Sequence, residues 1–152
     1  MRFRKQRPGA RIFEHLKDLL EDPRSWSLFP ETHAVLTRLR KEGFELGIVS
    51  NFDSRLFPVM RGLGIDRLFD TVTIASLARA AKPAPKIFEI ALEKHAIDPA
   101  EAMHVGDSVR DDLEGATKAG LTGVLLDRTG RSQVSGGHVI RTLEELLPLV
   151  GC

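Results

Sequence analysis

The chain has 152 residues, of which 42% are hydrophobic and 28% are charged, as is typical of one soluble globular domain. Its 22 Lys and Arg residues against 21 Asp and Glu residues leave a net charge of +1, so the overall charge gives no reason to expect nucleic acid or an anionic membrane as a partner. No apolar run approaches the roughly 20 residues that span a bilayer. The single cysteine, Cys152, excludes an internal disulfide framework and favours a reducing compartment, so we expect a cytoplasmic protein.

The amino-terminal 26 residues differ from the rest of the chain. The first eleven contain five basic residues and no acid: Arg2, Arg4, Lys5, Arg7 and Arg11. This run could be a phosphate-binding arm or a short targeting segment, but a solvated terminus is the simpler interpretation. Apolar residues at helical spacing then predict a helix over residues 11–27 that has no strand partner. We therefore divide the chain near Trp26, into an arm and helix over 1–26 and a main unit over 27–152.

The main unit alternates short apolar runs with helical patterns. The runs predict strands over 44–49, 72–75, 102–105, 124–126 and 138–140. Helices are predicted around 35–39 before Gly43, over 56–63 before Gly64, from Pro85 on, over 110–119 before Gly120, and after Thr142, which forms a capping box with Glu145. Such alternation predicts right-handed crossovers and a doubly wound α/β fold, in which helices cover a mostly parallel sheet.

A group of carboxylates follows the third predicted strand. Gly106, Asp107 and Ser108 come where this strand ends, and Asp111 and Asp112 follow in the first turn of a helix. Open parallel sheets bind ligands at the carboxyl ends of their strands, and carboxylates together with a phosphate suit Mg²⁺. Acids in a first turn also favour the helix dipole without any metal, which explains Asp111 equally well. Asp107 is harder to explain in this way.

Two further polar segments are predicted at the same sheet edge. Ser50 and Asn51 follow the strand over 44–49, and Lys82 precedes the helix that Pro85 begins. Taken alone, Ser50 is best explained as a turn or cap residue and Lys82 as a solvated surface residue. In combination with Asp107 they favour a phosphate site, with hydrogen-bond donors and a positive charge for its oxygens.

These segments, in this order and spacing, resemble motifs two, three and four of the haloacid dehalogenase superfamily. The resemblance rests on the runs 49–53, 82–88 and 105–120 and extends over about residues 26–150. Most members are magnesium-dependent phosphatases that work through an aspartyl-phosphate, and others are dehalogenases, phosphonatases or phosphomutases. The resemblance therefore implies a Rossmann-type core, here incomplete, and makes the helix within 1–26 the remnant of a cap domain.

The resemblance also implies roles for individual residues. Ser50 would bind the transferred phosphoryl group with Asn51 alongside. Lys82 would neutralise charge on the nucleophile and the phosphate. A magnesium ion would be held by Asp107, with support from Asp112. Catalysis would then depend mainly on electrostatic stabilisation by Ser50, Lys82 and Asp107.

The family's first motif, Asp-x-Asp-x-Thr after an apolar strand, is not found. The string 70–73 lacks the second carboxylate and precedes its strand, Asp53 is better explained as a cap, and residues 1–10 do not resemble a buried parallel strand. In the family this strand lies between those predicted over 44–49 and 102–105. We therefore expect two unpaired sheet edges, which favour self-association or pairing with a complementing chain.

We accordingly expect a haloacid dehalogenase-like hydrolase derived from a magnesium-dependent phosphatase of small phosphorylated metabolites, whose nucleophile comes from elsewhere. One alternative is a non-catalytic module that binds magnesium and phosphate or a partner. Another is a truncated fragment of a larger enzyme. An unrelated nucleotide-binding domain has less support, because no Gly-x-Gly-x-x-Gly or Walker-type loop follows any predicted strand.

Overall fold

The computed structural model describes residues 22–134 and 137–152, so the basic arm and most of the helix predicted over 11–27 lie outside the described residues. The described part begins with a short 3-10 helix, η1 (Pro23–Ser25), followed by helix α2 (Thr32–Lys41). Next to the predicted domain boundary, the ring of Trp26 contacts that of Phe52 edge-to-face, at 5.8 Å between centroids. None of the described helices is long and apolar enough to cross a membrane.

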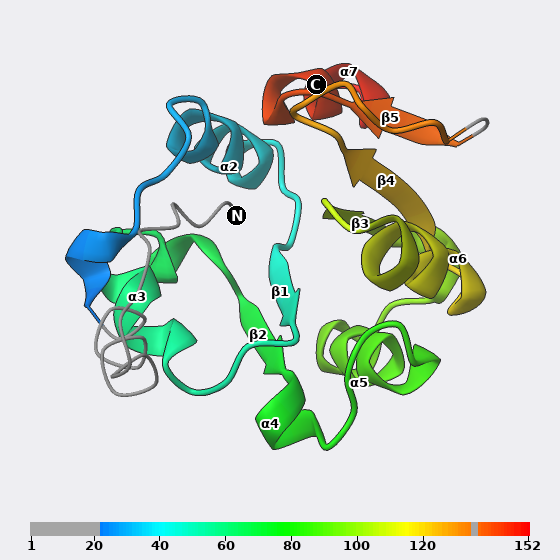
Figure 1. The fold of residues 1–152 in the computed structure, drawn as a ribbon, viewed down its shortest axis with the longest axis horizontal. Coiled ribbons are helices and arrows are strands. Elements are labelled where there is room, and N and C mark those ends of the chain that lie inside the picture. The colour runs from blue at the N-terminus through cyan, green and yellow to red at the C-terminus, as the bar shows by residue number, and fades with distance from the viewer. Residues whose placement is uncertain (1–21, 135–136) are drawn as a thin grey trace, which may run out of the picture.

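Five parallel strands form two groups. Strand β1 (Gly47–Ser50) pairs with β2 (Thr71–Ile74), and β3 (Met103–Gly106), β4 (Thr122–Leu126) and β5 (His138–Ile140) form the second group in that order (Figure 1). Helices connect the strands, which confirms the predicted α/β fold with a parallel sheet. Among the described strands, β1 pairs only with β2, and β3 pairs with β4 but not with β1. The two unpaired sheet edges expected from the absence of the family's first motif are thus seen among the described strands.

Strand β1 begins three residues later than predicted because a carboxylate takes over the pairing of the preceding residue. Asp70 accepts a hydrogen bond from the Leu46 N–H at 2.8 Å and donates its own N–H to the Leu46 carbonyl at 2.7 Å. The guanidinium of Arg40 holds this carboxylate at 2.8 Å. Phe44, 39% exposed, lies before this junction. Asp70, rejected above as a nucleophile, therefore anchors the start of β1.

The helices follow the predicted pattern, with shifts at their ends. In chain order they are α3 (Leu56–Gly62), η2 (Asp66–Leu68), α4 (Ala75–Ala78), α5 (Pro85–His95), η3 (Pro99–Glu101), η4 (Val109–Glu114), α6 (Gly115–Lys118), η5 (Leu143–Glu145) and α7 (Leu146–Leu149). Gly64 and Gly120 have positive φ angles, as expected of glycines that end helices. The capping box of Thr142 and Glu145 is present at η5. Helix α4 is not predicted by the sequence pattern, and η4 is π-helical.

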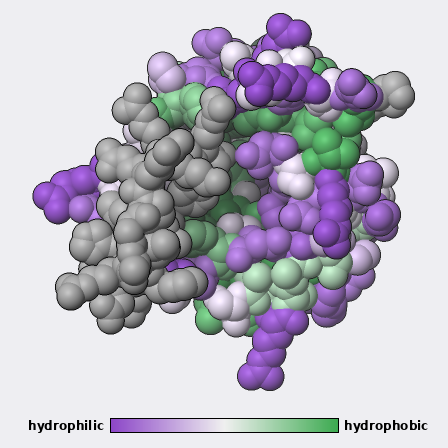
Figure 2. Space-filling model, in the orientation of Figure 1, coloured by the Kyte–Doolittle hydropathy of each residue, from purple (hydrophilic) through white to green (hydrophobic). Residues whose placement is uncertain are grey.

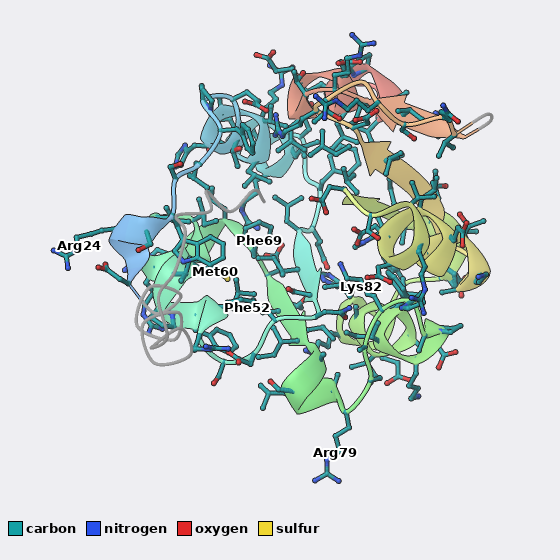
Figure 3. The ribbon with its side chains drawn as sticks, in the orientation of Figure 1. Arg24, Phe52, Met60, Phe69, Arg79 and Lys82 are labelled. Carbon is teal, nitrogen blue, oxygen red and sulfur yellow. The ribbon has the colours of Figure 1, made fainter. Side chains whose placement is uncertain are left out.

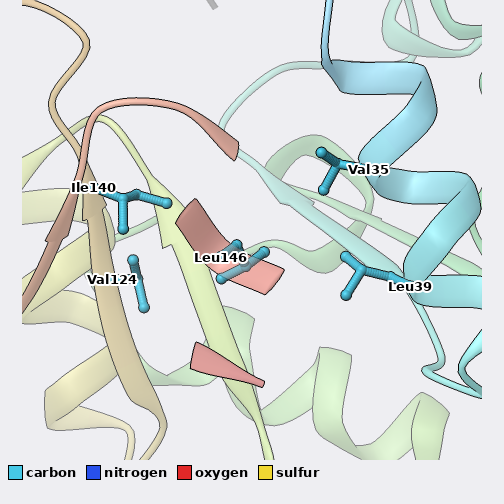
Figure 4. Close-up of a cluster of buried hydrophobic side chains, with 5 residues drawn as sticks. All are labelled: Val35, Leu39, Val124, Ile140 and Leu146. Carbon is cyan, nitrogen blue, oxygen red and sulfur yellow. The ribbon is translucent and has the colours of Figure 1, made fainter. Parts of the chain in front are cut away.

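Two clusters of buried side chains cover the opposite faces of the broken sheet. In the first, Val35 and Leu39 of α2 pack towards β4, β5 and α7 (Figure 4). In the second, Ile87 and Phe88 of α5 pack against Ala116 of α6. A third cluster, centred on Leu56, Met60, Ile65 and Ile74, fixes α3 against β2. In the second cluster, Phe88 of α5 contacts His104 of β3 while Val49 of β1 packs against the same cluster, so α5 holds the two strand groups together.

Candidate functional site

The carboxyl ends of β1 and β3 carry the predicted site residues. Ser50 is the last residue of β1, and its Oγ accepts a hydrogen bond from the Phe52 N–H at 3.1 Å. This contact forms the turn that leads out of the strand and still allows the hydroxyl proton of Ser50 to be donated to a ligand. Asp107 comes directly after β3 and is exposed at the surface.

Asn51 fixes the loop that carries Lys82. Its carboxamide donates to the Lys82 carbonyl at 3.0 Å and accepts from the Lys82 N–H at 2.7 Å. This two-point contact joins the end of β1 to the segment between α4 and α5. Both the nitrogen and the oxygen of the Asn51 carboxamide contact the Lys82 backbone. In this geometry Asn51 positions the Lys82 loop. The predicted contact between Asn51 and a phosphate stays a prediction.

The side chain of Lys82 is directed inward to a buried carboxylate. Its Nζ lies 2.5 Å from Oδ1 of Asp112, and the two side chains are 13% and 5% exposed. In Figure 3, Lys82 lies between β1 and the α5 and α6 segments, whereas Arg24 and Arg79 project away from the molecule. An isolated lysine is expected at a solvated surface position, and this expectation is wrong for Lys82.

Asp112 is held at both of its oxygens. His104 donates from Nε2 to Oδ1 at 2.8 Å, and the N–H of Ser108 donates to Oδ2 at 3.0 Å. Burial by itself would raise the pKa of the Asp112 carboxyl, but the hydrogen bonds from His104 and Lys82, with the charge of Lys82, hold that pKa well below its ordinary value. Asp112 is therefore an anion, and it keeps the lysine charge in place.

Gly106 is required by the position of Asp112. A Cβ atom at this glycine would overlap the Asp112 carboxyl group and lie 2.6 Å from the Asp112 Cβ. A second close approach lies nearby, where a Cβ on Gly115 would come within 3.1 Å of the Pro83 Cα. The two glycines therefore allow η4 and α6 to pack closely against β3 and the Lys82 loop.

A continuous chain of contacts thus connects the two strand ends. It runs from Asn51 through Lys82 and Asp112 to Ser108, which is two residues beyond β3. The residues just before the two ends of this chain are Ser50 and Asp107. Both strands therefore end at one edge of the molecule. A hydroxyl, an ammonium group and carboxylates are gathered there, which suits a phosphate and a cation.

Asp107 also lines a cavity of about 660 Å³ at the ends of β3 and β4. Apolar side chains, including Phe29 and Val109, form much of the wall. Arg128 stacks on the Phe29 ring with its Cζ 3.5 Å from the centroid, and it pairs with Glu31 at 2.6 Å. This ion pair holds the segment before α2 against the loop after β4, and so fixes one wall of the cavity.

The described residues fit part of a magnesium site. Asp107 provides a carboxylate at a strand end, where oxygen ligands are expected. The oxygens of Asp112 already contact Lys82, His104 and the Ser108 N–H. Within residues 22–134 and 137–152, no group of three or more His, Cys, Asp or Glu side chains is placed to hold a metal ion. The predicted metal role of Asp112 is therefore supportive at most in this geometry.

His104 is the residue that sequence reasoning missed. It lies in the middle of β3, within a run otherwise made of apolar residues, and its ring packs edge-to-face against Phe88 at 5.1 Å. The signal for His104 in the sequence is a polar side chain within an apolar strand, because a buried polar group needs a hydrogen-bond partner. Asp53, predicted as a helix cap, instead makes a local turn contact before α3: it accepts from the Arg55 N–H at 3.0 Å and pairs with the Arg55 guanidinium at 2.6 Å, whereas the N-cap of α3 is Arg55.

Comparisons with known proteins show which family the chain resembles. The model of a hydrolase family, haloacid dehalogenase-like hydrolase, matches residues 3–120. Haloacid dehalogenase-like hydrolase domain-containing protein 3 from Mus musculus is 34% identical over 143 residues, which cover 90% of this chain and 57% of the relative. Glyceraldehyde 3-phosphate phosphatase from Methanothermobacter thermautotrophicus is 33% identical over 100 residues, covering 65% and 44% of the two chains.

A solved structure has the same fold as this chain. The crystal structure of a HAD phosphatase from Thermococcus onnurineus superposes with a TM-score of 0.83 at 34% identity, covering 91% of this chain and 64% of that one. The chain therefore spans somewhat more than half the length of the first curated relatives that it matches.

Proposed function

Because the chain belongs to the haloacid dehalogenase-like hydrolases, we propose that it is the core of a phosphatase that acts on small phosphorylated metabolites with the help of Mg²⁺. The observation that carries this proposal is the chain of contacts from Asn51 to Ser108 through the Lys82–Asp112 ion pair. Relatives named as phosphatases support the reaction class. The cavity beside Asp107 offers room for the rest of a substrate.

Each residue has a defined task in this proposal. Ser50 donates its hydroxyl proton to a phosphoryl oxygen, since its Oγ already accepts from the Phe52 N–H. Lys82 supplies positive charge with the donors that Asp112 does not use, and Asp112 keeps that charge aimed at the strand ends. Asp107 is the carboxylate that would hold Mg²⁺, and the bound ion would offset charge on the phosphoryl oxygens. The attacking carboxylate comes from outside the residues named here.

The missing Asp-x-Asp-x-Thr motif favours a second candidate function. Without a nucleophile the same residues would form a module that binds phosphate and magnesium and catalyses nothing. Both candidate functions use Lys82 and Asp107. Only the phosphatase hydrolyses a phosphate ester.

Hydrolysis and binding assays on the same preparations test the proposal. The phosphatase proposal predicts magnesium-dependent release of p-nitrophenol from its phosphate ester, lost in Lys82→Met and in Asp107→Asn, and such turnover requires an attacking carboxylate beyond the residues assigned above. Lys86→Met is the matched control, because Lys86 is 60% exposed and contacts Glu89 at 3.4 Å on the surface of α5. Saturable binding of inorganic phosphate without turnover would support the binding module instead. Turnover that survives Lys82→Met would contradict the assigned role of Lys82.

A further inference from the structure

His104 is a buried polar side chain to which the proposed reaction gives no task. It lies in the middle of β3, and its side chain is 12% exposed. Its Nε2 lies 2.8 Å from Oδ1 of Asp112. An ionised carboxylate only accepts hydrogen bonds, so His104 Nε2 carries the proton of this contact. The imidazole is therefore a hydrogen-bond donor to the carboxylate that holds Lys82.

His104 and Lys82 share one oxygen of Asp112. The Lys82 Nζ also contacts Oδ1, at 2.5 Å, whereas Oδ2 accepts from the Ser108 N–H at 3.0 Å. A carboxylate oxygen has about two lone-pair sites, so the two side chains together fill the acceptor sites of Oδ1. His104 therefore prevents a second contact between the Lys82 ammonium and this oxygen.

The Lys82 ammonium keeps further donors in this arrangement. An ammonium group has three N–H donors, and within the described part of the chain its hydrogen-bond partner is Asp112 alone. The Lys82 side chain is 13% exposed, so a small anion can reach part of it. Figure 2 shows hydrophilic and hydrophobic surface side by side in the region where Figure 3 labels Lys82. The remaining N–H groups can therefore donate to phosphate oxygens.

The His104 ring is held from two sides. As a residue of β3, His104 lies opposite Gly123 of β4 in the strand register. Its ring packs edge-to-face against Phe88 at 5.1 Å between centroids. Phe88 is fully buried on α5, the helix that follows the Lys82 loop. The imidazole donor therefore has little freedom to turn away from Asp112.

We propose that His104 is a positioning residue of the phosphate site, which acts through Asp112 on Lys82. By filling one acceptor site of Oδ1 and offsetting part of the Asp112 charge, His104 leaves the Lys82 ammonium with more donors and more charge for a phosphate. Without the imidazole donor, Lys82 is drawn further towards Asp112, and the less compensated carboxylate repels a nearby anion. The inference rests on the proposed function, because it assigns His104 to the same phosphate site.

Isothermal titration of inorganic phosphate into the full chain at saturating Mg²⁺ tests this role. The variants are His104→Leu, which has no donor, and His104→Gln, whose amide nitrogen can donate from a side chain of similar reach. Phe88→Leu is the matched control, because it loosens the packing around His104 without removing a hydrogen bond. Urea unfolding followed by circular dichroism measures the stability of each variant.

We expect phosphate to bind about tenfold more weakly to His104→Leu, the low end of the loss that follows removal of a supporting partner at a metal site. His104→Gln should bind phosphate almost as wild type does. Phe88→Leu should unfold at a lower urea concentration than wild type and bind phosphate equally well, whereas a purely structural role of His104 would make affinity follow stability. If His104→Leu does not fold, His104→Asn replaces it, because its amide lies one bond nearer the backbone and falls short of Asp112.

Three outcomes overturn the inference. One is unchanged phosphate affinity in His104→Leu when Lys82→Met weakens binding. Another is an affinity in His104→Gln as low as that in His104→Leu, because the donor would then not matter. The third is an equal loss of affinity in Phe88→Leu, because His104 would then act only through packing. Each of these results leaves the proposed function intact, whereas a wild-type chain that binds no phosphate contradicts the proposed function and the inference together.

Discussion

Lys82 and Asp112 form an ion pair at 2.5 Å that is almost completely shielded from solvent. The two residues come from different segments, the loop before α5 and the π-helical η4. Their contact connects the parts of the molecule that carry β1 and β3, and it places a buried positive charge at the predicted phosphate site. We therefore expect stability and phosphate binding to depend on the same pair.

Replacing Asp112 by Ala should destabilise the fold strongly. The substitution leaves the Lys82 ammonium without its carboxylate and removes the acceptor of His104. Loss of one member of a buried pair costs about 3–5 kcal/mol, which urea unfolding followed by circular dichroism will measure. Glu114→Ala is the control, since this exposed residue contacts Lys118 at 3.7 Å. A loss in Asp112→Ala no larger than that in the control would contradict the role of the buried pair.

The stability of the protein should depend on pH through Asp112. Its folded pKa lies below the ordinary value of 3.8, so the unfolded state takes up its proton first as the pH falls. The stabilisation that the ionised Asp112 carboxylate provides is therefore fully present at pH values above 3.8, and it is lost as the pH falls towards the pKa of the folded state. The difference in unfolding free energy between wild type and Asp112→Asn should be constant from about pH 5 to pH 7 and shrink below pH 4. A difference that grows on acidification would contradict this sign.

Gly106→Ala should disrupt the site from within the strand. The new Cβ would overlap the Asp112 carboxyl group, so either β3 or the first turn of η4 has to shift. We expect a loss of stability of about 1–3 kcal/mol, the usual cost of overpacking, together with loss of phosphate binding. Gly64→Ala gives the comparison, because its φ of +69° is strained for alanine but its surroundings are open. If Gly64→Ala abolished phosphate binding to the same extent, the effect would not be specific to Asp112.

Asn51→Ala should weaken the site more than the fold. The substitution removes both contacts with the Lys82 backbone, at 3.0 and 2.7 Å, in an exposed setting. We expect unfolding to cost about 1–2 kcal/mol less than in wild type, and phosphate binding to fall severalfold because the Lys82 loop is less well held. Isothermal titration of phosphate at saturating Mg²⁺ measures the second effect. Unchanged phosphate affinity would show that Asn51 has no positioning role.

The strands and most helices could be predicted because local signals and tertiary packing agree. The apolar run at 138–140, the proline that begins α5 and the capping box of Thr142 all place their elements correctly. The start of β1 could not be predicted, because it depends on a hydrogen bond between Leu46 and Asp70, 24 residues apart. Short helix α4 lacks a strong periodic pattern, and its position follows from the connection between β2 and the Lys82 loop.

The positions of the candidate residues at the strand ends could be predicted from the sequence, whereas the contacts among them could not. Strand ends identified Ser50, Asp107 and the Lys82 loop, since parallel strands bring such positions to one edge. Sequence spacing could not show that Asn51 contacts the Lys82 backbone or that His104 completes the environment of Asp112. Both contacts join segments whose side-chain directions are set by the packing of α5 and η4 against the strands.

We propose that Lys82 and Asp107 belong to one site for phosphate and magnesium. Titration of inorganic phosphate, with and without Mg²⁺, into wild type, Lys82→Met, Asp107→Asn and the control Lys86→Met shows whether they do. We expect Lys82→Met to weaken phosphate binding at least tenfold, Asp107→Asn to remove the magnesium dependence, and Lys86→Met to behave as wild type. Phosphate binding that is equal in all four proteins, or unaffected by Mg²⁺ in wild type, would contradict the claim.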